Sequence, residues 1–97
     1  MAIDRMTLLL AELNMRNAPQ GRKEQLQQLL DVAAARIEQI GITLDPVDAG
    51  DMHLHVEYAA WLYRRRAQAD AAIMPRYLQL DLNDRLVSEK ARVSDGS

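Results

Sequence analysis

Apolar residues recur three and four positions apart along one stretch of this chain, which is the spacing of one face of a helix. The members of this row are Leu26, Leu30, Ala33, Ile37 and Ile40. We therefore predict a helix over about residues 22–40, with Gly41 as its C-terminal stop. The same spacing suits a coiled coil, but two or three heptads are few for one, so a bundle helix is favoured.

Two further helices follow from weaker patterns. The first covers about residues 3–14, with Asp4 as N-cap, and a loop over residues 14–21 follows it. Its apolar face consists of Met6, Leu9, Leu10 and Leu13. The other covers about residues 75–91 and begins at Pro75, a residue favoured in the first turn. It carries two apolar rows, which suggests two neighbours: Leu78, Leu82 and Leu86 on one side, and Leu80 and Val87 on another.

A helix over about residues 49–68 has no polar face in its middle. Residues 59–63 are apolar or aromatic at five consecutive positions and include the only tryptophan, Trp61. Consecutive positions point in every direction around a helix, so this segment must be covered on most sides. It is either the central helix of a small bundle or a helix whose surface is completed by another subunit.

These elements predict an all-α fold, a small bundle of about four helices that assembles through surfaces of the third and fourth. Ninety-seven residues with 48% hydrophobic and 27% charged positions fit one globular domain, here residues 1–92 with a flexible tail over residues 93–97. The expected core consists of Leu26, Leu30, Ala33, Ile37, Val56, Ala59, Leu62, Leu78, Leu82 and Leu86.

Composition narrows the possible functions. The formal net charge of −2 gives no global basic field, so broad nucleic-acid binding is not indicated. Cysteine is absent, which removes disulfides, thiolate nucleophiles and Cys-based zinc sites. The chain has no glycine-rich phosphate loop, no signal-peptide pattern and no apolar run of about 20 residues. We expect a soluble, intracellular protein that is not an enzyme, binds no cofactor and does not enter a membrane.

Two groups of residues resemble metal sites but fail on spacing. Residues 45–51 hold Asp45, Asp48 and Asp51, yet they lack the alternating oxygen ligands and terminal Glu of a calcium loop. Helix capping and compensation of the helix dipole explain these acids better. His53 and His55 lie about 200° apart on a helix, so they cannot hold one metal from the same face.

The triple arginine 64–66 allows two interpretations. It could be a solvated helix end, since bases near a helix C-terminus favour the dipole. Alternatively, its guanidinium groups could bind carboxylates of a partner, or phosphates. Tryptophan, tyrosine and arginine are enriched at interface hot spots, although Trp61 could equally belong to the core.

Several segments together resemble the head–tail connector (adaptor, or head-completion) proteins of tailed bacteriophages. They are YAAWLYRRR at 58–66, MPRYL at 74–78, LNDRLVSEK at 82–90 and AAARIE at 33–38 followed by GI at 41–42. The resemblance covers residues 22–90. It rests on packing and interface patterns, and the first helix and the loop to residue 21 lie outside it.

This resemblance implies a structural virion protein that forms a homo-oligomeric ring, expected to be a dodecamer, beneath the portal protein. The ring would support a stopper or tail-completion protein, and DNA would only pass through its lumen. The expected location is the virion neck, after assembly in the host cytoplasm. The expected contacts between subunits and to the portal involve Trp61, Tyr63, Arg64, Arg65, Arg66, Arg76, Tyr77, Arg85 and Lys90. The alternative is a small helical nucleic-acid-binding or regulatory protein that uses Arg64, Arg65, Arg66 and Arg76 on phosphates.

Overall fold

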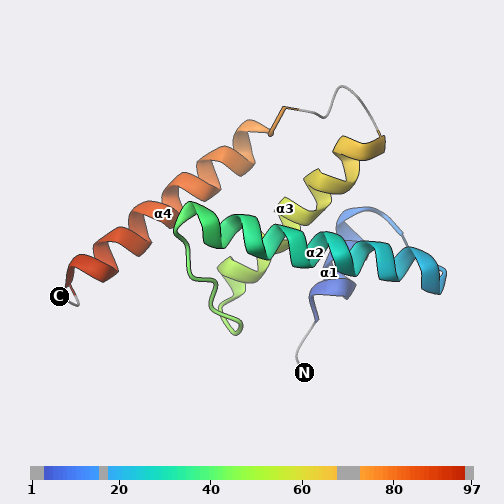
Figure 1. The fold of residues 1–97 in the computed structure, drawn as a ribbon, viewed down its shortest axis with the longest axis horizontal. Coiled ribbons are helices and arrows are strands. Elements are labelled where there is room, and N and C mark those ends of the chain that lie inside the picture. Colours follow the sequence, from blue (N-terminus) through green and yellow to red (C-terminus); the bar gives the residue numbers. More distant parts are fainter. Residues whose placement is uncertain (1–3, 16–17, 68–72, 96–97) are drawn as a thin grey trace.

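The computed structural model describes residues 4–15, 18–67 and 73–95, and this part of the chain forms four helices (Figure 1). They are α1 (Arg5–Glu12), α2 (Gln20–Ile40), α3 (Ala49–Ala67) and α4 (Arg76–Asp95). The prediction of an all-α bundle of four helices is confirmed. Within the described residues, no helix combines the length and apolar composition needed to cross a membrane.

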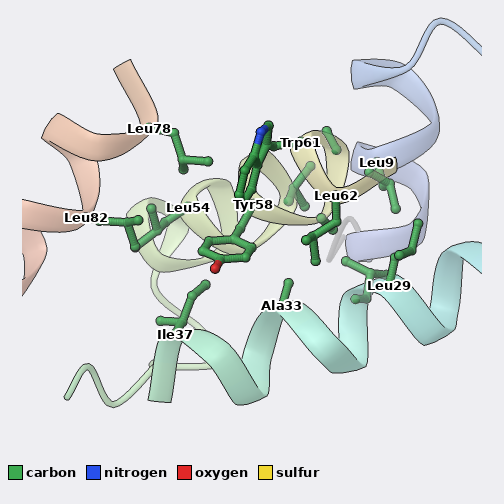
Figure 2. Packing of buried hydrophobic residues seen from close by; sticks show 14 of the residues in the cluster. Leu9, Leu29, Ala33, Ile37, Leu54, Tyr58, Trp61, Leu62, Leu78 and Leu82 are labelled. Carbon is green, nitrogen blue, oxygen red and sulfur yellow. The ribbon is translucent and has the colours of Figure 1, made fainter. Parts of the chain in front are cut away.

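Helix α3 lies at the centre and packs against each of the other three helices. Figure 2 shows α3 between its neighbours, with α4 on one side, α1 on the other and α2 below. Helices α2 and α3 run in opposite directions, because His55 contacts Leu30 whereas Tyr63, two turns later, contacts Arg22. This arrangement selects the first of the two options for α3, the central helix of the bundle.

The burial of α3 is continuous over nine residues, 54–62, and includes its charged and polar members. Trp61 is only 6% exposed and meets the ring of Tyr58 edge-on, with centroids 5.5 Å apart (Figure 2). Leu9 of α1, Leu26 of α2 and Leu78 of α4 are completely buried in the same cluster. The single described chain therefore places Trp61 in its own core.

Local signals in the sequence mark where the helices begin and end, as predicted. Asp4 caps α1, since its Oδ1 accepts a hydrogen bond from the backbone N–H of Thr7 at 2.7 Å. Gly41 ends α2 with a φ of 113°, a left-handed conformation that strains any residue with a Cβ. Asp48 Oδ2 accepts from the N–H of Asp51 at 2.9 Å at the start of α3. The capping interpretation of the acidic segment is confirmed.

The boundaries differ from the prediction in α1, α2 and α4, and α1 (Arg5–Glu12) is shorter than the range 3–14 expected for it. Helix α2 begins at Gln20, two residues earlier than predicted. Pro19 is its N-cap residue and has an extended conformation, which proline adopts readily before a helix. Helix α4 begins after Pro75, whose carbonyl accepts the N–H groups of Leu78 and Gln79. It continues to Asp95, so residues 93–95 of the predicted tail are helical. Residues 96–97 lie outside the described part, as do residues 68–72 between α3 and α4.

The predicted core is confirmed at nine of its ten positions, and the exception is Leu86. Leu86 is half-buried and packs at the edge of the cluster. The reason is its position, since Leu86 lies beside the exposed Gly41 where α2 ends, at the margin of the bundle. The radius of gyration, 14.1 Å, exceeds the ~12.5 Å typical of a compact domain of this length.

Replacing Trp61 with Ala should lower the free energy of unfolding by about 3–5 kcal/mol, because the substitution leaves a cavity in the buried cluster around α3. Urea denaturation followed by far-UV circular dichroism measures it. Val47→Ala, at an apolar side chain that is 87% exposed, serves as the control and should change stability by less than about 0.5 kcal/mol. Equal effects of the two substitutions would contradict the central position of Trp61.

Candidate interaction surface

The three arginines at the end of α3 have different surroundings. Arg64 Nη2 donates to the carbonyl of Glu12 at 3.1 Å and lies 3.7 Å from the Glu12 carboxylate, so it caps the C-terminus of α1. Arg65 lies over the ring of Trp61, one turn earlier, with its guanidinium carbon 5.2 Å from the centroid. Arg66 is exposed. Arg64 therefore has a structural role, whereas Arg65 and Arg66 face outward.

A second pair of cations lies beside this helix end. Arg22 donates to the hydroxyl of Tyr63, and its guanidinium carbon lies 5.8 Å from the tyrosine ring centroid. Lys23 follows it on α2, and both side chains are exposed. We name Arg22, Lys23, Arg65 and Arg66 the basic end. Tyr63 and Trp61 are two positions apart, about 200° around α3, so these cations lie around the helix end and not on one face.

Arg85 is not on this surface. Its Nε donates to Asp51 at 2.7 Å, its Nη1 to Glu89 at 2.9 Å and its Nη2 to the carbonyl of Thr43 at 2.8 Å. The side chain is only 15% exposed, and these bonds raise its pKa above the usual arginine value. Arg85 joins α4 to α3 and to the connector before α3, so its guanidinium is already used within the chain.

The remaining predicted contact residues lie on α4. Arg76, Tyr77 and Lys90 are exposed, and Tyr77 belongs to a row on the side opposite the core. This row follows the spacing of one helix face, and all its members are exposed. We name it the outer face of α4, and its members are Tyr77, Leu80, Asp84, Val87 and Ala91. The structure thus places Tyr63, Arg65 and Arg66 around the end of α3, and Arg76, Tyr77 and Lys90 on the exposed side of α4.

A hollow of about 390 Å³ lies between the start of α3 and α4, and aspartates dominate its rim. The acidic residues that line it are Asp48, Asp51, Asp81 and Asp84, and His53 lies among them. No three His, Asp or Glu side chains converge as metal ligands anywhere in the described residues. The hollow is therefore an acidic surface next to the outer face of α4.

Glu57 is a buried carboxyl in the contact between α3 and its neighbours. Its side chain is directed toward Asp81 of α4 and Glu12 of α1, and it contacts His53 one turn earlier. Burial, together with the facing carboxylates, raises the pKa of Glu57 to about 7. Its Oε2 is buried without a hydrogen-bond partner. Glu57 is thus partly protonated at neutral pH, and its ionisation opposes the packing around it.

The two histidines lie in different environments, as their spacing predicts. His53 is exposed on the surface of α3, whereas His55 is buried. The Nε2 of His55 donates to the carbonyl of Leu30 at 2.7 Å, so Nδ1 is left unprotonated and without a described partner. Burial lowers the pKa of His55, which keeps the ring neutral in the α2–α3 contact.

Sequence reasoning missed two of these arrangements. The Asp51–Arg85 pair joins residues 34 positions apart, and only the i,i+4 spacing of Arg85 and Glu89 gave a local indication of it. The Arg22–Tyr63 contact spans 41 positions. Both depend on the antiparallel packing of neighbouring helices, which local periodicity does not specify.

No protein-family model matches this chain, and none of the curated proteins or solved structures compared with it does so either.

Replacing Arg85 with Met should destabilise the fold by about 1.5–3 kcal/mol, because Asp51 and Glu89 lose their charge-assisted hydrogen bonds to the guanidinium. Arg36→Met, at an exposed position of α2, is the matched control and should stay within about 0.5 kcal/mol. Chemical denaturation at neutral pH measures both. A loss no larger than that of the control would show that the Arg85 bonds contribute nothing net.

The raised pKa of Glu57 predicts a pH dependence of stability. A carboxyl that is protonated more readily in the folded state stabilises it fully below the unfolded pKa of 4.5, and this contribution is lost as pH rises to about 7. Glu57→Gln should remove the loss and be more stable than the unmodified chain above about pH 7, by about 1–3 kcal/mol.

The buried His55 acts in the opposite sense, since its lowered pKa stabilises the fold above about pH 6.5 and less as pH falls. Denaturation at a series of pH values from about 4 to 8 therefore separates the two groups. The Glu57→Gln chain should show only the histidine slope, with stability rising toward neutral pH. Identical pH profiles of the two chains would rule out Glu57 as the titrating group.

Proposed function

We propose that this chain is a structural subunit of the head–tail connector of a tailed bacteriophage, forming a ring between the portal and the stopper or tail-completion protein. The proposal rests on the residue patterns at 58–66, 74–78 and 82–90, which resemble that family. The first pattern supplies the central helix and part of the basic end. The last supplies Arg85, Glu89 and two residues of the outer face of α4, Asp84 and Val87.

The observation that carries the proposal is the surface left after folding. The core is complete without a partner, yet α4 still exposes Tyr77, Leu80 and Val87 on one face. A lone small domain gains nothing from such a row, whereas an assembly subunit uses it for contact.

The alternative, a small nucleic-acid-binding or regulatory protein, draws support from one observation. The basic end gathers Arg22, Lys23, Arg65 and Arg66, and such a group also suits phosphates. The outer face of α4 and the acidic hollow, however, would oppose a DNA backbone. We therefore favour a protein partner.

Mixing the purified chain with portal rings of the same phage should give a complex with the rotational symmetry of the portal. Sedimentation and native mass measurement of the mixture would detect it. The same preparation should show no duplex-DNA binding at moderate salt. Failure to bind portal, together with DNA affinity that falls steeply as salt rises, would instead support the nucleic-acid-binding alternative.

A further inference from the structure

Helix α4 depends on α3 more than the other two outer helices do. Helices α1 and α2 pack against α3 and against each other, whereas α4 packs chiefly on α3. Leu78 and Leu82 of α4 are buried and point toward α3 (Figure 2), and Leu86 lies beside Gly41 at the end of α2. A change that weakens the α3–α4 contact therefore acts on α4 first.

A buried carboxyl group lies in this contact. The side chain of Glu57 on α3 is only 6% exposed and lies within hydrogen-bonding reach of Asp81 on α4. Asp81 is itself exposed, at the rim of the acidic hollow. Oε1 of Glu57 contacts His53, and Oε2 is buried without a hydrogen-bond partner among the described residues. When both carboxyls are ionised, two negative groups face each other and neither can donate a hydrogen bond.

One proton resolves this conflict. A protonated carboxyl donates from its O–H, so a proton on Glu57 or Asp81 forms a hydrogen bond between α3 and α4 and removes one of the two facing charges. Because the two groups interact closely, such a proton belongs to the pair and not to either residue. Burial, together with the facing Asp81 and Glu12, raises the pKa of Glu57 to about 7, so the proton is retained well above the ordinary range of a carboxyl.

The other charged groups near Glu57 do not replace this proton. Glu12 of α1 is acidic, and its carboxylate lies 3.7 Å from Arg64. His53 carries a positive charge only when it is protonated, and its side chain is 68% exposed to water. Loss of the proton therefore leaves Glu57 and Asp81 repelling each other across the α3–α4 contact.

Cations of α4 and α2 are engaged elsewhere or lie in solvent. Arg85 lines the same hollow as Asp81, but its guanidinium is bound to Asp51 and Glu89. All charged side chains of α2 are exposed, so α2 brings no buried cation to the opposite side of α3.

We propose that Glu57 and Asp81 share one proton and form a pH-sensitive latch, which holds α4 against α3 while the proton is bound and weakens this contact when it is lost. Detachment uncovers Leu78, Leu82 and the side of α3 against which they pack. The latch is a property of the fold and is independent of the proposed function.

The direction of the pH effect follows from linkage. The bound proton favours the docked helix fully below pH 4.5, and this contribution is lost as pH rises to about 7. Because a single proton is involved, the ratio of docked to detached α4 changes by at most about tenfold per pH unit within this window.

Hydrogen exchange of the full chain at pH 5 and pH 7 tests the latch. Amides of α4 should be less protected than those of α2 and should depend less on added denaturant, because they exchange through local detachment. After correction for the intrinsic pH dependence of exchange, their protection should fall by about tenfold or more from pH 5 to pH 7. Amides of α4 that exchange only together with those of α2 would overturn the latch.

Two substitutions remove the shared proton. Glu57→Gln keeps the size of the side chain and donates to Asp81 at every pH, so the fall in α4 protection should disappear. Asp81→Asn removes the facing charge from the exposed side of the contact, where it does not disturb the core, and should reduce the fall to less than about threefold. Glu38→Gln, on the exposed side of α2, is the matched control and should keep the original pH dependence.

The variants also distinguish the shared proton from burial alone. If Glu57→Gln removes the fall while Asp81→Asn leaves it intact, Glu57 responds only to its own burial and the latch is wrong. A fall that persists in both variants would overturn it as well. Should Glu57→Gln fail to fold, as seen by circular dichroism, Asp81→Asn decides the outcome by itself.

Discussion

The structure depends on covering one helix. Helix α3 is buried continuously from residue 54 to residue 62, so each of its sides needs a neighbour. Helices α1, α2 and α4 each cover part of it. A helix without a polar face is stable in water only in this central position.

Enclosing α3 also buries polar groups, and most of these groups have hydrogen-bond or ion-pair partners within the chain. Asp51 is held by the N–H of Asp45 and by Arg85, and His55 donates to the carbonyl of Leu30. Glu57 is less well compensated, because its neighbours Asp81 and Glu12 are acidic and its Oε2 has no hydrogen-bond partner among the described residues. Its raised pKa is the consequence, since protonation relieves both burial and repulsion.

The same packing separates the charges of a nearly neutral chain. Antiparallel α2 and α3 bring the start of one beside the end of the other, which gathers the basic end. The aspartates that cap α3 lie at its opposite terminus, next to Asp81 and Asp84 of α4. A net charge of −2 therefore conceals local groups of opposite sign.

The sequence by itself determined the helices, their caps and most of the core, because these follow from local spacing. Leu26, Leu30, Ala33 and Ile37 recur with the helical period, and Asp4 and Gly41 act on residues within one turn. The interaction partners of the arginines did not follow from local spacing. Arg64 caps a helix 52 positions away and Arg85 pairs across 34, while Arg66 stays exposed. These differences were decided only by the tertiary structure, since helix packing sets which long side chain reaches a distant carboxylate or carbonyl.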